Sequence, residues 1–177
     1  MESDRDNRRL SKAMAYQLRH GHDVALLPGG WARVTDLIDV VRPRGGRDAL
    51  VGAVSGGDKP RFELSNDGAL IRARYGHSRD VDLEYLPVRP PDVLYHGTAV
   101  ATLPVLLAEG IRRQRRRFVH LSDDVTTARQ VGARHGPPVV LRVAAGAMAA
   151  AGYRFFHAAQ GMWLTDAVPA DHLTALD

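Results

Sequence analysis

A proline-rich segment divides the sequence into two parts with different patterns. The stretch YLPVRPPDVLY, residues 85–95, holds three prolines among its first seven residues. Proline fixes φ and lacks an amide donor, so this composition is typical of a stiff connector rather than of a core helix or strand. We therefore predict two lobes that meet near residue 90, with domain ranges of 1–88 and 89–177.

The first part combines helical spacing with a hairpin pattern. Residues 9–21 predict a helix, with Ser11 as a possible N-cap and Gly21 as its end. A Pro-Gly-Gly turn, a short strand over residues 31–34 and a helix from Thr35 follow. Residues 61–76 alternate around an Asn-Asp-Gly turn, which is typical of a β-hairpin. Helix, helix and hairpin in this order predict a winged-helix module.

The second part is richer in strands. Apolar runs predict strands at residues 93–98, 117–122 and 137–145, and one or two further strands within residues 154–176. Helices are predicted at residues 100–110 and 122–136, the second capped by Ser122 or Asp123. The whole chain is therefore expected to be α+β.

The composition limits the possible classes of protein. The hydrophobic content of 45% in 177 residues can supply a sizeable core, which indicates a globular chain. There is no cysteine, so disulfides, thiolate metal sites and thiol nucleophiles are excluded. No apolar run reaches the ~20 residues of a membrane span, and the charged N-terminus does not resemble a signal peptide. We expect a cytoplasmic protein.

Arginine dominates the basic residues. Of 24 lysines and arginines, 22 are arginine, and five of them lie within residues 112–117, directly before an apolar strand pattern. The planar guanidinium fork suits bidentate phosphate binding. A solvated surface remains the simpler interpretation of this run. Codon bias is the simpler explanation for most arginines elsewhere in the chain. A phosphate site therefore needs the support of arginines that cluster in space.

Four histidine motifs are candidates for chemistry: Arg19-His20, Gly76-His77-Ser78, His96-Gly97-Thr98 and His120-Leu121-Ser122. None has the spacing of a metal site, and the chain lacks the sequence signatures of the common nucleotide-binding folds. Each motif alone is more often structural than functional. Together, however, Arg19, Arg72 or Arg74, and one arginine of 112–117 could converge with a histidine around a phosphate dianion.

These motifs, in order, resemble those of the RNA 2′-phosphotransferases of the KptA type. The matching stretches are LSKAMAYQLRH, RFELSNDGALIRARYGHS, LYHGT, EGIRRQRRRFVHLSDD, ARQVGARHGPPVVLRV and GMWLTDAVP. The resemblance implies an N-terminal winged-helix-like RNA lobe and a C-terminal, β-rich ADP-ribosyltransferase-like lobe that binds NAD.

The resemblance also implies the site residues. Its catalytic tetrad falls on Arg19, His20, Arg72 and Arg116, with Arg115 and Arg117 as alternatives for the last position. Its NAD site falls on His96, Gly97, Thr98, His120, Leu121 and Ser122, with residues 132–136 near the adenosine half, and its substrate contacts on Arg74, His77 and Ser78. Tyr75, Phe118 and the stretch AAQGMWL, residues 158–164, depart from the usual pattern and affect peripheral contacts. No metal is expected.

The implied reaction removes an internal RNA 2′-phosphate in two steps, with NAD as co-substrate and RNA as partner, by a protein expected to be a monomer without a membrane partner. Two alternatives remain. An NAD-dependent ADP-ribosyltransferase acting on nucleic-acid ends or protein would stop at a stable adduct. A non-catalytic winged-helix nucleic-acid-binding protein would not consume NAD.

Overall fold

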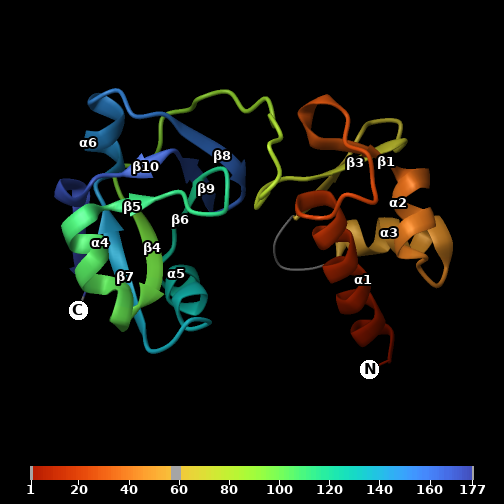
Figure 1. The fold of residues 1–177 in the computed structure, drawn as a ribbon, viewed down its shortest axis with the longest axis horizontal. Coiled ribbons are helices and arrows are strands. Elements are labelled where there is room, and N and C mark those ends of the chain that lie inside the picture. The colour runs from red at the N-terminus through yellow and green to blue at the C-terminus, as the bar shows by residue number, and fades with distance from the viewer. Residues whose placement is uncertain (1, 57–60, 177) are drawn as a thin grey trace. The chain divides into compact units, whose positions relative to one another are not determined.

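The computed structural model describes residues 2–56 and 61–176, with side chains from residue 5 onward (Figure 1). It forms two compact units, Met1–Glu84 and Tyr85–Asp177, called unit 1 and unit 2 below. Both units combine helices with antiparallel sheet, which confirms the predicted α+β class. Within the described ranges, no helix is both long and apolar enough to cross a membrane.

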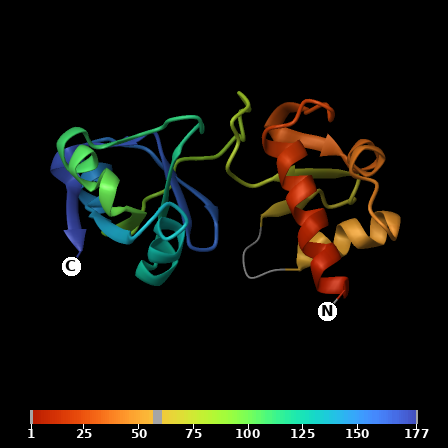
Figure 2. The ribbon, with the colours of Figure 1, turned by 60° about the horizontal axis from the view of Figure 1, so that its bottom comes forward.

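Unit 1 packs three helices against a small sheet (Figures 1 and 2). Its sheet has the antiparallel order β1-β3-β2. In chain order the elements are α1 (Glu2–Arg19), the 3-10 turn η1 (Pro28–Gly30), β1 (Trp31–Arg33), α2 (Val34–Val41), α3 (Gly46–Ser55), β2 (Phe62–Leu64) and β3 (Leu70–Ala73).

The amphipathic pattern of α1 explains its place in unit 1. Met14 and Leu18 are fully buried and pack with Leu37, Leu50 and Ile71 from the other elements. The prediction of Ser11 as N-cap is wrong, because Ser11 is buried within the helix and Arg61 Nη1 donates to its hydroxyl at 3.4 Å.

The hairpin prediction is confirmed by the antiparallel pairing of β2 with β3. Gly68 adopts a φ of 68° in the turn, and its amide donates to Ser65 O at 2.8 Å. Asp67 Oδ1 accepts from the amide of Ala69 at 3.0 Å. Helix α3 was not predicted, because its two glycines weaken the helical pattern.

Unit 2 is built on a six-stranded antiparallel sheet in the order β11-β7-β4-β6-β9-β8, beside a two-stranded ribbon of β10 and β5. Its elements are β4 (Leu94–Ala99), η2 (Val100–Thr102), α4 (Leu103–Glu109), β5 (Ile111–Arg112), β6 (Val119–Ser122), α5 (Val125–Gly132), β7 (Pro138–Val143), α6 (Ala145–Ala150), β8 (Phe155–Ala159), β9 (Met162–Thr165), β10 (Ala167–Val168), η3 (Ala170–His172) and β11 (Leu173–Leu176).

Three predictions for unit 2 need correction. The last part of the chain holds four strands rather than one or two, because tight turns interrupt its apolar runs. Helix α5 is capped by Asp124, whose carboxylate accepts from the amide of Thr127 at 2.6 Å, and not by Ser122 or Asp123. Strand β6 starts at Val119 rather than at Arg117.

Helix α5 lies directly against β4 through two glycines. A Cβ on Gly97 would overlap the carbonyl oxygen of Ala128, and one on Gly132 would lie 2.7 Å from Thr98 O. Glycine is therefore required for this backbone-to-backbone contact, which places the helix over a strand that carries candidate site residues.

We predict that Gly97→Ala lowers the free energy of unfolding of unit 2 by about 2–4 kcal/mol, because the backbones must move apart. Gly52→Ala in α3 is the matched control, since its Cβ meets nothing within 4 Å. The control should be neutral or slightly stabilising. Denaturant unfolding followed by circular dichroism measures both, and equal stabilities for the two variants would contradict the close contact.

Candidate active site

The end of α1 is tied to the segment that follows β3. The carbonyl oxygen of Arg19 accepts from the amides of Ser78 at 3.1 Å and Arg79 at 3.4 Å. Arg79 Nη1 in turn donates to Gly21 O at 2.9 Å. Four residues of the resemblance, Arg19-His20 and His77-Ser78, are thus held together although 56 residues separate the two pairs in the sequence.

The side chain of Arg19 packs against this segment. Its Cζ lies 5.0 Å from the centre of the Tyr75 ring, a cation–π geometry. Gly76 has a φ of 90°, and a Cβ there would lie 3.4 Å from three atoms of the Arg19 side chain. The glycine therefore permits both the turn and the close approach of the half-buried arginine.

His20 is oriented by a hydrogen bond. Its Nδ1 lies 2.8 Å from Ser78 Oγ, and the tautomer decides which of the two atoms donates. The ring centre is 6.2 Å from that of Tyr16, one turn earlier on α1. His20 is exposed, so this bond directs its imidazole at the surface of unit 1.

Arg72 is the most constrained arginine of the predicted tetrad. Its Nε donates to Glu63 Oε2 at 2.9 Å, and its Nη1 donates to Gly29 O at 3.2 Å. Its Cζ lies 4.5 Å from the centre of the Trp31 ring. These contacts fix the guanidinium plane, with 17% of the side chain exposed.

The partners of Arg72 were missed at the level of the sequence. Glu63 and Trp31 both face Arg72 in the register of the sheet, one from β2 and one from β1. Counting outward from the Asn-Asp-Gly turn could have paired Glu63 with Arg72. Nothing local in the sequence indicates the pairing of Trp31, because it depends on which strand lies beside β3.

Of the other residues expected to contact substrate, Arg74 is half-buried and its Nε donates to Phe62 O at 3.3 Å. His77 is 2% exposed, and its Nε2 is 3.8 Å from the position of a Cβ on Gly30. Ser78, by contrast, is exposed and reaches His20.

Arg19, His20, Arg72 and Ser78 of unit 1 are called the phosphate cluster below, after the role that we propose for them. Arg19 and His20 contact the segment Tyr75–Ser78, and Arg72 lies on the strand that leads into it. Two guanidinium groups stacked on aromatic rings and one oriented imidazole can bind an anion and exchange a proton near neutral pH.

In unit 2, the candidate dinucleotide residues lie on two neighbouring strands, β4 and β6. Along its described length β4 pairs with β7 over six residues, but its ladder with β6 consists of the pair Tyr95–Ser122. Beyond that pair the two strands are joined by a side chain, because His96 Nδ1 lies 3.1 Å from His120 O. Side chains rather than a backbone ladder thus line this part of the sheet.

The polar side chains here are mostly buried. Thr98 is 9% exposed and Ser122 is 7% exposed, and Ser122 Oγ accepts from the amide of Asp124 at 3.2 Å. His120 Nδ1 lies 3.1 Å from Phe118 O. Leu121, also expected at the NAD site, is buried in the core of unit 2, so its side chain supports the sheet.

Burial lowers the pKa of His96, and its hydrogen bond with His120 opposes the shift only in part. A neutral imidazole is therefore favoured beside the two strands. Because His120 O can only accept, the neutral ring donates through Nδ1 and leaves Nε2 as an uncharged acceptor.

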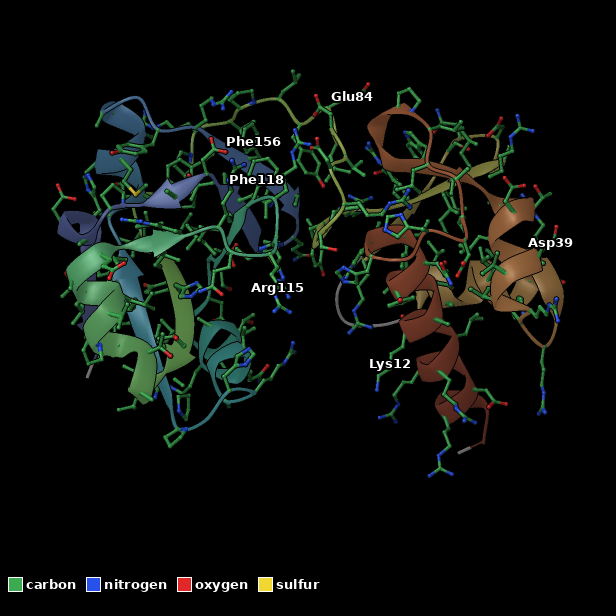
Figure 3. All side chains as sticks on the ribbon, viewed as in Figure 1. Lys12, Asp39, Glu84, Arg115, Phe118 and Phe156 are labelled. Atoms are coloured by element: carbon green, nitrogen blue, oxygen red, sulfur yellow. The ribbon has the colours of Figure 1, made fainter. Side chains whose placement is uncertain are left out.

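The arginine run lies between β5 and β6. Residues 113–118 are outside the strands, and Arg115 and Arg116 are exposed there. Arg115 is labelled in Figure 3. Arg117 Cζ lies 5.8 Å from the centre of the Phe118 ring, which is 5.2 Å from that of Phe156. The run is thus anchored at its end by aromatic packing, and Arg116 projects from a short connection rather than from a strand.

Metal ligands do not gather in the described ranges, where no group of three or more His, Cys, Asp or Glu side chains could hold a metal ion. Unit 1 offers cations and imidazoles, and unit 2 separately offers a pair of strands with buried hydroxyl and half-buried imidazole groups. Such groups suit an enzyme that transfers a phosphorylated or otherwise anionic group.

Comparison with known proteins identifies the family. The model of the family described as RNA 2′-phosphotransferase, Tpt1/KptA family, matches residues 4–167. A probable RNA 2′-phosphotransferase of Hahella chejuensis is 45% identical, covering 94% of this chain and 93% of its own length. One of Agrobacterium fabrum is 49% identical, covering 93% and 91% respectively. The chain belongs to the RNA 2′-phosphotransferase family.

We predict that stability depends on pH through His96. In the unfolded chain its pKa returns to about 6.5, so the unfolded state binds more protons below that value. The contribution of His96 to stability is thus fully present above about pH 6.5 and is lost as the pH falls toward the lower folded-state pKa.

The check is the free energy of unfolding at about pH 7.5 and about pH 5.5 for the wild type and for His96→Asn, which keeps a donor near the position of Nδ1. The variant should lose less stability on acidification than the wild type. An equal loss in both proteins would show that His96 is not held in its neutral form.

Proposed function

We propose that this RNA 2′-phosphotransferase uses NAD as its co-substrate and transfers the RNA 2′-phosphate to ADP-ribose in two steps. The observation that carries the proposal is the phosphate cluster: Arg19 and His20 meet Ser78 across the fold of unit 1, in a chain whose family acts on RNA 2′-phosphates. Unit 1 would be a winged-helix-like RNA lobe, and unit 2 an ADP-ribosyltransferase-like lobe.

In the first step, an oxygen of the RNA 2′-phosphate attacks C1″ of the NAD ribose. The bond from C1″ to the nicotinamide nitrogen breaks, and its electron pair leaves with neutral nicotinamide. A phosphate oxygen is already anionic, so no carboxylate base is needed. Arg19 and Arg72 of unit 1 would hold the dianion in place for attack, and Arg116 is the fourth residue that the family resemblance gives to this role.

In the second step, the ribose 2″-hydroxyl attacks the phosphorus and the bond to the RNA 2′-oxygen breaks. The hydroxyl gives up its proton and the RNA oxygen gains one, which yields RNA with a 2′-hydroxyl and ADP-ribose 1″,2″-cyclic phosphate. His20 is the group suited to move a proton here, since Ser78 orients its ring and its charge can change near neutral pH.

The NAD would lie along β4 and β6. His96, Gly97, Thr98, His120 and Ser122 are the residues proposed to contact it, with Leu121 supporting them from the core. A neutral His96 fits this role, because it offers a hydrogen bond to a ribose or amide group without adding a charge beside the cationic nicotinamide.

The test is a product analysis with NAD and a 2′-phosphorylated RNA. The proposal requires one nicotinamide released for each 2′-phosphate removed, together with ADP-ribose 1″,2″-cyclic phosphate and RNA bearing a 2′-hydroxyl. A stable ADP-ribosyl adduct would instead favour an ADP-ribosyltransferase that stops after the first step. Phosphate removal without NAD would overturn the role of the dinucleotide.

We predict that Arg19→Ala, Arg72→Lys and Arg116→Ala each reduce kcat/KM by about 10²–10³, the loss typical of one preorganised transition-state donor. Lysine at 72 keeps the charge but loses the fork bound to Glu63 and Gly29. Circular dichroism checks that each variant folds. Arg115→Ala and Arg117→Ala are the neighbouring controls. If one of them loses activity while Arg116→Ala keeps full activity, the fourth arginine of the tetrad is that neighbour and not Arg116.

We predict that His20→Ala slows the second step more than the first, because proton transfer is needed only there. Rapid-quench analysis should then show accumulation of the ADP-ribosylated RNA phosphate. Ser78→Ala should show the same accumulation to a smaller extent, since it removes the partner that orients the ring. If His20→Ala slows nicotinamide release as much as cyclic phosphate formation, His20 acts mainly in binding.

A further inference from the structure

The exposed face of α1 is strongly basic and ends at the phosphate cluster. At 3.6 residues per turn, the side chains that form this face fall within an arc of about 120° around the helix axis. They are Arg5, Arg8, Arg9, Lys12 and Tyr16, followed by Arg19 and His20 at the end of the helix. We call the first five the α1 basic face.

This face points away from the core of unit 1. Met14 and Leu18 lie on the opposite side of the helix and are fully buried. Lys12 is exposed and projects from the side of α1 opposite to α2 and α3 (Figure 3). Among the described side chains of α1, residues 5–19, Asp6 is the single acidic one, and it lies beside the arc rather than within it.

An aromatic side chain stands between the cations and the cluster. Tyr16 is 58% exposed, which is unusual for a large ring without a burial role. Its ring also neighbours that of His20, with centres 6.2 Å apart. Cations that follow a backbone, interrupted by an exposed ring on which a base can stack, are the combination that binds single-stranded nucleic acid.

Helix α3 offers no comparable surface. It carries one arginine and one aspartate, Arg47 and Asp48, and Arg47 Nη2 donates to Gly68 O at 2.7 Å. The charge of unit 1 thus favours α1 over the third helix, which a winged-helix protein would usually place on nucleic acid.

We propose that the RNA strand flanking the 2′-phosphate lies along the α1 basic face. Its backbone phosphates would contact Arg5, Arg8, Arg9 and Lys12, and a base next to the modified nucleotide would stack on Tyr16. From Arg5 to Arg19 the helix spans about 21 Å, room for a strand of several nucleotides. The inference rests on the proposed function, because that function places the 2′-phosphate at Arg19 and His20.

The test compares two substrates: a 2′-phosphorylated dinucleotide, and the same dinucleotide within a single-stranded 12-mer. The variant is Arg9→Gln/Lys12→Gln. Its matched control is Arg33→Gln/Arg44→Gln, which removes the same charge from two exposed arginines of unit 1 outside α1. Steady-state kinetics should show a KM for the 12-mer raised roughly tenfold in the α1 variant only, with kcat and the dinucleotide KM unchanged.

Salt dependence gives a second reading. Loss of two phosphate contacts should reduce the slope of log KM against log salt for the 12-mer by about 1.4, at about 0.7 per contact in a single strand.

Tyr16→Ala should raise the KM for the 12-mer roughly tenfold, and Tyr16→Phe should restore it because the ring still stacks.

The inference fails if the 12-mer KM of the α1 variant equals that of the wild type, if the control pair shows the same increase, or if the dinucleotide is affected as much as the 12-mer. Binding of an unmodified 12-mer without NAD, followed by fluorescence anisotropy, separates this failure from that of the proposed function. If the wild type is active and the α1 variant binds the 12-mer as tightly as the wild type does, only the role of the α1 basic face is overturned. If the wild type is inactive but the α1 variant binds the 12-mer more weakly than the wild type does, the role of the α1 basic face is retained and the proposed chemistry is overturned.

Discussion

The attachment of the end of α1 to the segment after β3 is the constraint on which the candidate site depends. Arg19 O accepts two amides from that segment, and His20 bonds to Ser78. A helix end normally leaves carbonyl groups without intrahelical partners. Here one of those groups is used to fix a loop, so the same residues that complete the helix also hold the histidine and arginine in position.

The two arginines of unit 1 are held in similar ways by different elements. Arg19 lies over Tyr75, and Arg72 lies over Trp31 with its fork bound to Glu63 and a backbone carbonyl. Stacking restricts the guanidinium plane, which lowers the entropy lost when a phosphate binds. Because Glu63 offsets one positive charge, the cluster is suited to a dianion that arrives and leaves rather than to a permanently bound anion.

Periodic patterns in the sequence sufficed for the second half of α1, for the β2–β3 hairpin and for the α+β class, because each arises from local spacing; they missed the start of α1 at Glu2. The sequence failed where long-range packing decides. Helix α3 contains glycines that only its place in the core offsets. Of the four strands after α6, β9, β10 and β11 pair with the earlier strands β6, β5 and β7, and β8 pairs with β9. The motifs singled out Arg19, His20 and Arg72 as candidates, but the partners of Arg72, Trp31 and Glu63, depend on the register of the sheet.

The central claim is that a phosphate dianion is bound by the cluster in unit 1. A crystal structure of the protein with a 2′-phosphorylated dinucleotide tests it most directly. The account predicts the 2′-phosphate within hydrogen-bond distance of the guanidinium groups of Arg19 and Arg72 and of the imidazole of His20. A 2′-phosphate bound at a different surface, with these three side chains in contact with solvent, would contradict it.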